Sequence, residues 1–173
     1  MAPLNIHPLF VHFPVALLTL AALLELVRFQ RLLQRSYLFY TKAFLVITGT
    51  ITGFAAFQTG ELLEHLYDGT STARVVELHA TLASATLALF GILSVFYITQ
   101  WLEREQLLPR LRHMQLFRML HALGQRVTGT SFAYLTGAAG LLLITLTGAL
   151  GGIIAYGPDI DPVASFVYRL LFR

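Results

Sequence analysis

Long apolar stretches fill most of the chain and are separated by short polar segments. Two of them, Phe10–Val27 and Phe132–Tyr156, contain a single charged residue, Glu25. A helix that crosses a bilayer needs about 20 apolar residues, and a backbone in lipid must satisfy its own hydrogen bonds, which leaves helices or closed barrels. Barrel strands alternate apolar and polar positions, whereas these stretches are unbroken. The pattern therefore predicts an all-α, polytopic membrane protein.

Four transmembrane helices account for the apolar stretches and form one domain, residues 1–173. The predicted spans cover residues from about 9–33, 41–66, 75–103 and 130–157. Pro8 opens the first span and Gly157-Pro158 follows the last, as expected for proline at helix starts and a Gly-Pro pair after helix ends. The predicted fold is a four-transmembrane-helix bundle.

The segment at about 104–127 has a different pattern from the spans. Its apolar residues recur at roughly helical spacing, and arginines lie among them. This predicts an amphipathic helix in the membrane interface between the third and fourth spans, kinked at Pro109. His113 and His121 are then solvated interfacial side chains. The last stretch, 158–173, is too short for a fifth span, so we expect an interfacial tail or a contact with a partner.

The charged residues indicate the orientation in the membrane. Only 12% of residues are charged, against about 25% in soluble domains. Nine of the twelve lysines and arginines fall in two alternate connections: Arg28, Arg31, Arg35 and Lys42, then Arg104, Arg110, Arg112, Arg118 and Arg126. Such connections are typical of the cytoplasmic side. We therefore expect both termini outside and, despite a net charge of +3, no nucleic-acid partner.

The chain has no cysteine. This excludes disulfides, thiolate metal sites, iron–sulfur clusters and covalently attached c-type heme. Histidine, methionine, tyrosine and carboxylate side chains remain as ligands. Neither a nucleophile elbow nor a His-Glu-x-x-His motif is present. An electron-transfer or accessory subunit therefore fits better than a stand-alone enzyme.

Four of the six histidines, His7, His12, His65 and His79, fall at span ends that face the outer side. An ionisable ring at that depth is a pointer to function. His12 and His79 each lie about one turn inside a span, on parallel helices, and this favours them as axial ligands of one heme b. His7 projects about 140° away from His12 on an ideal helix. Either His7 or His65 would then bond the heme propionates or serve a second heme.

Three glycines of the fourth span, Gly148, Gly151 and Gly152, lie level with these histidines. They would leave room for a flat cofactor, although small residues also let membrane helices pack closely. Gly137 and Gly140 lie deeper and are interpreted as packing residues.

Other functions use the same residues. Three histidines with a carboxylate can hold copper or zinc, and Glu61, Glu64 and Glu77 could carry protons near a quinone. In a cofactor-free structural subunit of a respiratory or photosynthetic complex, the histidines would instead bond backbone or partner groups. The partners expected for a heme subunit are membrane lipid, other redox subunits, and a quinone or an external cytochrome.

The opening of the chain resembles a known family. The string from His7 to Leu18 reads HPLFVHFPVALL and is similar to the HPxxVHFPxAL opening of domain of unknown function 2231, an uncharacterised bacterial four-span membrane domain. That family has a further histidine at the start of its third span, which matches His79. It often closes with a GGxxxYxxG-like stretch, and residues 151–157, GGIIAYG, are similar.

The resemblance implies that His7, His12 and His79 act as a set, in a bacterial inner membrane. It implies a redox setting because such domains often accompany cytochrome-like proteins, but it carries no established activity. We interpret the chain as a b-type heme subunit that moves electrons near the periplasmic face, within a larger redox complex.

Overall fold

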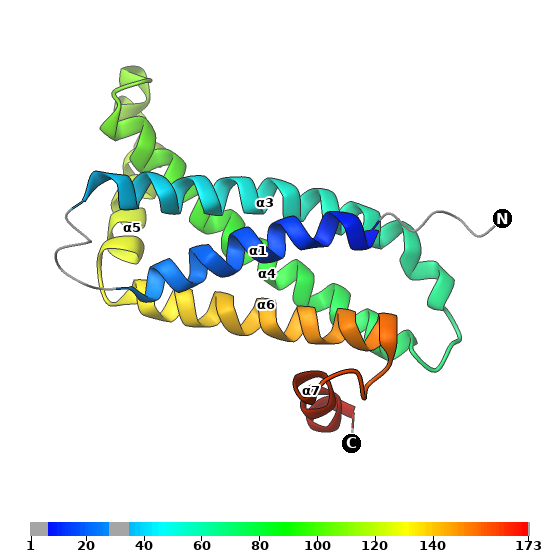
Figure 1. Ribbon diagram of the computed structural model, residues 1–173. Helices are drawn as coiled ribbons and strands as arrows, with labels where there is room; N and C mark the ends of the chain where they lie inside the picture. Colours follow the sequence, from blue (N-terminus) through cyan, green and yellow to red (C-terminus); the bar gives the residue numbers. More distant parts are fainter. Residues whose placement is uncertain (1–6, 28–34, 173) are drawn as a thin grey trace.

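The computed structural model describes residues 7–27 and 35–172. This part of the chain forms helices and turns, and no strand occurs in it. It contains four long helices: α1 (His7–Leu26), α3 (Ser36–Glu64), α4 (Ala73–Arg104) and α6 (Phe132–Tyr156). Figure 1 shows them side by side, with successive helices running in opposite directions. The predicted all-α class is confirmed.

The long helices enclose one packed interior. Among the four, α1 packs against α3 and α6, and α4 packs against the same two helices. Helices α1 and α4 therefore occupy opposite corners of the bundle. The central core cluster includes Leu18, Ala22, Val46, Phe90, Leu93, Tyr97 and Ile144.

Three helical segments, Ser36–Tyr67, Ala73–Arg104 and Phe132–Tyr156, are long and apolar enough to cross a membrane. The apolar part of α1, Phe10–Leu26, is shorter; residues 28–33, predicted to end the first span, lie outside the described residues. Large apolar side chains are exposed on the outside of the bundle: Phe13, Ile51, Phe54, Ile92, Leu135 and Leu142. An apolar exterior of this extent fits lipid rather than water.

Glycines bring the helices close together inside the bundle. A Cβ built on Gly137 of α6 would lie 2.9 Å from the carbonyl oxygen of Ala22 on α1. One built on Gly140 would lie 2.7 Å from the Phe90 ring, and one on Gly49 of α3 would lie 2.5 Å from Leu18. The helices leave no room for a side chain at these positions. The packing role predicted for Gly137 and Gly140 is confirmed.

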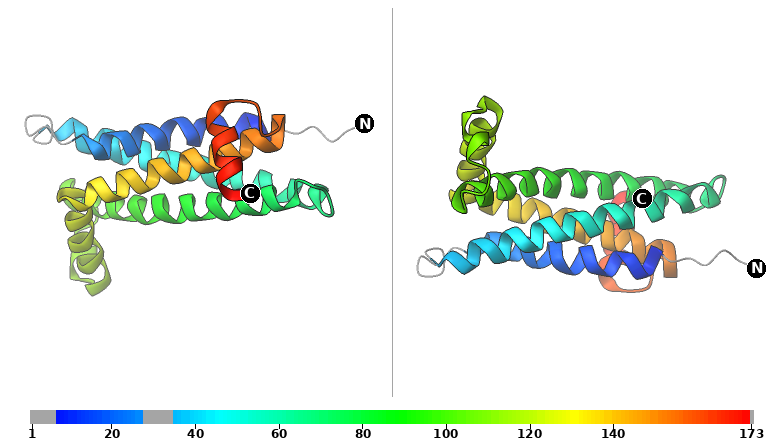
Figure 2. Two further views of the ribbon diagram at one scale, coloured as in Figure 1. Left: turned by 90° about the horizontal axis from the view of Figure 1, so that it is seen from below. Right: turned by 90° about the horizontal axis from the view of Figure 1, so that it is seen from above.

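Shorter elements lie at both ends of the bundle (Figure 2). At one end, η1 (His65–Tyr67) leads toward α4, and α7 (Pro162–Phe172) packs against α6. At the other end lie η2 (Pro109–His113) and α5 (Gln115–Gly129), with α5 crosswise to the long helices. We name these the η1 end and the α5 end.

The segment predicted as a single helix at about 104–127 is divided. Helix α4 continues to Arg104, Pro109 begins η2, and α5 starts only at Gln115. Leu108 has φ −133° and ψ 72°, which is outside the helical region. Proline disfavours helical geometry in the residue before it. Pro109 therefore separates two helices instead of kinking one.

The C-terminal stretch, predicted as a tail, forms a capped helix. Gly157 ends α6 with φ +91°, a conformation that favours glycine. Asp161 Oδ1 then accepts hydrogen bonds from the backbone N–H groups of Val163 (2.7 Å) and Ala164 (2.9 Å). This is an N-cap that fixes the start of α7.

Candidate functional site: a histidine pair and a buried charge network

His79 lies in the second turn of α4, at the η1 end, and is half-buried. Its Nδ1 is 2.9 Å from the backbone carbonyl oxygen of Thr147 on α6. A carbonyl oxygen only accepts, so Nδ1 carries the hydrogen and donates it. In the neutral ring, Nε2 then holds the lone pair.

His7 is the first residue of α1 and is also half-buried. Its Nδ1 is 3.0 Å from the carbonyl oxygen of Ala56 and 2.9 Å from Oγ1 of Thr59, both on α3. The Thr59 hydroxyl donates its own hydrogen to the same carbonyl, at 2.7 Å. The ring therefore donates through Nδ1, and the neutral form has the same tautomer as His79.

These two imidazoles, here named the histidine pair, belong to opposite corners of the bundle. Both lie toward the η1 end, His7 at the start of α1 and His79 in the second turn of α4. Each ring also lies against a glycine of the helix that accepts its hydrogen bond. A Cβ built on Gly60 would lie 3.1 Å from Cε1 of His7, and one built on Gly151 would lie 3.3 Å from Cε1 of His79.

A second polar site lies inside the bundle, toward the α5 end. Glu25, Lys42 and Tyr97 are 1%, 4% and 2% exposed. Lys42 Nζ is 3.0 Å from Glu25 Oε2, and the Tyr97 hydroxyl donates to Glu25 Oε1. This charge network joins α1, α3 and α4. Ionisable groups at membrane depth face a bundle interior and pair with one another, and this network does both.

The position of Lys42 corrects the sequence analysis, which placed it in a basic connection. Helix α3 begins at Ser36, so Lys42 lies in its second turn, on the same buried face as Leu38 and Val46. The lone charge of Glu25 in an apolar stretch was the signal for this site. A buried carboxylate needs a partner. Lys42 is a cation near the adjoining end of the next span, so the sequence offered it as that partner.

Most of the sequence matches one known protein family. A family described as "Predicted membrane protein (DUF2231)" matches residues 3–161. The chain belongs to this family. The resemblance to domain of unknown function 2231 is thereby confirmed, and the matched range includes the histidine pair and the charge network. Neither a curated protein nor a solved structure matches the chain.

In this DUF2231 chain, the two histidines of the opening motif have different surroundings. His12 is exposed, whereas His7 is half-buried and bonded to α3. Of these two histidines, His7 is the one held against a neighbouring helix. The interior face of α1 includes Pro14, and seven residues before it on the same face lies His7. Which histidines are ligands stays a prediction.

Not all of the other predicted site residues lie at the histidine pair. His65 is exposed at the start of η1. Gly151 lies against His79, whereas a Cβ built on Gly148 or Gly152 would meet no atom within 4 Å. The described residues therefore place one glycine of the predicted three against a histidine ring. Four residues that bond or contact the two rings were not among the predicted site residues: Ala56, Thr59, Gly60 and Thr147.

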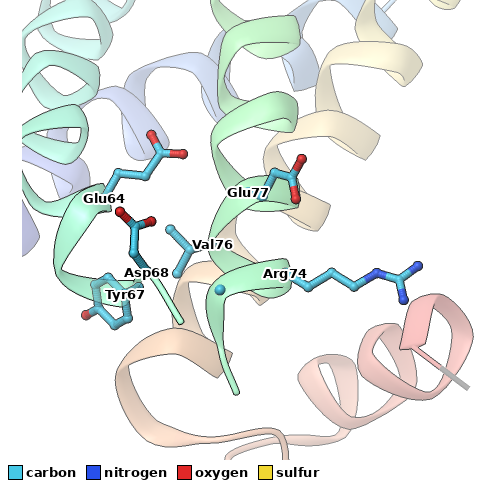
Figure 3. Close-up of a pocket in the computed structure, with 7 residues that line it drawn as sticks. Glu64, Tyr67, Asp68, Arg74, Val76 and Glu77 are labelled. Atoms are coloured by element: carbon cyan, nitrogen blue, oxygen red, sulfur yellow. The ribbon is translucent and has the colours of Figure 1, made fainter. Parts of the chain in front are cut away.

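An open pocket of about 590 Å³ lies at the η1 end. Figure 3 shows Glu64 and Asp68 on one side, Glu77 on α4, and Arg74 extending toward α7, where its guanidinium lies 6.0 Å from the Phe172 ring centroid. Glu64 and Glu77 belong to the carboxylates predicted to carry protons near a quinone. Within residues 7–27 and 35–172, no group of three or more His, Asp or Glu side chains is arranged to hold a metal ion.

Proposed function

We propose that the chain is a multi-pass membrane subunit that binds b-type heme at the η1 end through His7 and His79. The observation that carries this proposal is that the two rings make matching hydrogen bonds through Nδ1. Each donates Nδ1–H to a carbonyl oxygen of a neighbouring helix, from opposite corners of one bundle. Ligating histidines characteristically donate their second ring nitrogen in this way, which fixes tautomer and orientation.

The residues present fit this group. Two neutral imidazoles would supply two nitrogen ligands to the iron, and a chain with no cysteine can hold heme only without thioether links. Gly60 and Gly151 keep side chains away from the two rings. When bound, heme would supply one-electron transfer. The protein supplies the ligands, and Ala56, Thr59 and Thr147 hold them in one tautomer.

The membrane arrangement is part of the same proposal. Helix α1 serves as a fourth span beside α3, α4 and α6, and the arginine-rich α5 end faces the cytoplasm of a bacterial inner membrane. Both termini and the histidine pair then lie near the periplasmic face, with α5 as an interfacial helix. Electron partners would be other membrane redox subunits and a quinone or an external cytochrome.

A visible spectrum of the purified protein tests the proposal. We expect a b-type spectrum on reduction and about stoichiometric heme. A colourless protein that is helical and elutes as one species would reject heme, and elemental analysis of that sample would detect copper or zinc.

A cofactor-free structural subunit is the second candidate, and the same hydrogen bonds favour it. The His7 bond ties α1 to α3, and the His79 bond ties α4 to α6. A hydrogen bond of this kind stabilises a fold by about 1 kcal/mol. Under this alternative, replacing His7 or His79 lowers stability, and the unchanged protein shows no heme absorbance either.

Glycine variants test whether the space around the rings matters. Valine at Gly60 or Gly151 places a Cβ 3.1 or 3.3 Å from a ring carbon. Such overpacking costs about 1–3 kcal/mol, which corresponds to a loss of about 5-fold to 150-fold in heme affinity. Gly148→Val and Gly152→Val are matched controls, because a Cβ there meets open space. Heme content per protein, measured by absorbance, should fall in the first two only; equal content in all four would contradict the site.

A further inference from the structure

The α5 end carries an amphipathic helix with one exposed apolar stripe. Phe117 and Gly124 of α5 are buried, and a Cβ built on Gly124 would lie 3.0 Å from Cβ of Phe96 on α4. Leu116, Met119 and Leu123 are 58%, 57% and 44% exposed. Their spacing of three and four residues places them along one line of the helix. This stripe is therefore beside the bundle-facing side and is not covered by it.

The same segment is strongly basic. From Gln106 to Gly129 it contains four arginines and no acidic residue. Arg112 pairs with Glu103 at 2.9 Å. The other three, Arg110, Arg118 and Arg126, are exposed and have no ion pair within the described residues. Their positive charge is therefore available to an external anion.

The orientation of α5 indicates what covers its exposed apolar stripe. Figures 1 and 2 show it crosswise to the long helices, at one end of the bundle. Where the long helices cross a bilayer, such a helix lies along the bilayer surface. A helix with this combination of an apolar stripe and arginines binds at the boundary between acyl chains and headgroups, and anionic headgroups complement the arginines.

We propose that η2 and α5 form a docking surface for anionic phospholipid. Leu116, Met119 and Leu123 enter the acyl boundary, while Arg110, Arg118 and Arg126 contact headgroup phosphates. The surface is at the opposite end from the histidine pair, so this inference does not depend on heme binding.

Spin labels on the full chain test this directly, because the natural sequence has no cysteine. Met119→Cys places a label on the stripe, and Gln125→Cys is a matched control on the exposed polar side of α5. Both proteins are reconstituted in vesicles of phosphatidylcholine, with and without phosphatidylglycerol. We expect oxygen, and not a water-soluble nickel complex, to relax the label at position 119, with the reverse at position 125.

Two comparisons test the preference for anionic lipid. One changes the lipid composition, and the other changes the charge of the protein. Phosphatidylglycerol should shift the label at position 119 to a greater depth, and the triple variant Arg110→Gln, Arg118→Gln, Arg126→Gln should lose that shift. Equal depth in both lipid mixtures would overturn the preference for anionic lipid. A label at position 119 that the nickel complex reaches, or one that neither reagent reaches because another protein copy covers it, would overturn lipid as the occupant.

Discussion

Replacing His7 or His79 with alanine is expected to abolish the b-type spectrum, whereas replacing His12 leaves it unchanged. The two paired rings are each held in one tautomer by a helix carbonyl, and removal of either takes away one of the two imidazoles that would hold the heme. His12 is exposed on α1, so His12→Ala removes an imidazole that has no place in the pair. Reduced-minus-oxidised spectra, scaled to protein concentration, measure the outcome.

Loss of colour must be separated from loss of fold. His79→Asn keeps a side-chain donor near the Thr147 carbonyl but cannot replace Nε2, so it should regain thermal stability over His79→Ala and still lack heme. Retention of the spectrum in His7→Ala together with its loss in His12→Ala would show that the pairing expected from sequence is right and that the pair proposed from the structure is wrong.

The fold was largely predictable because the lengths of the apolar segments determine where the transmembrane helices lie. The third and fourth predicted spans, about 75–103 and 130–157, agree with α4 (Ala73–Arg104) and α6 (Phe132–Tyr156) within about two residues at each end. The second span was predicted to begin near residue 41, whereas α3 begins at Ser36. Lys42 was interpreted as a boundary residue, but its charge is neutralised inside the bundle by Glu25.

The choice between His7 and His12 depends on the rotation of α1 about its axis. Apolar residues surround this helix on all sides, so hydrophobic periodicity does not define an interior face. Glu25 does define it, because a charge in a spanning helix faces the bundle interior. His7 is 18 residues before Glu25, about five full turns, and therefore shares its face. The hydrogen bonds to Ala56 and Thr147 were beyond prediction, since they depend on which helices are neighbours.

Breaking the charge network from one side is expected to cause a large loss of stability. Lys42→Met leaves the Glu25 carboxylate buried without its cation, and Glu25→Gln leaves the Lys42 ammonium without its anion. An uncompensated buried charge lowers the free energy of unfolding by about 3–5 kcal/mol. Denaturant titration of the purified protein in detergent, followed by circular dichroism, measures the change.

The double variant Glu25→Gln, Lys42→Met should recover most of that loss, because no unpaired charge is left inside the bundle and the Tyr97 hydroxyl can donate to the new amide oxygen. Tyr97→Phe is a milder control, since it removes one donor to Glu25 Oε1 and is expected to lower stability by about 1–3 kcal/mol. A double variant whose loss equals the sum of the two single losses would mean that Glu25 and Lys42 do not stabilise each other. Because the network lies toward the opposite end from the histidine pair, variants that remain folded should keep the wild-type heme spectrum.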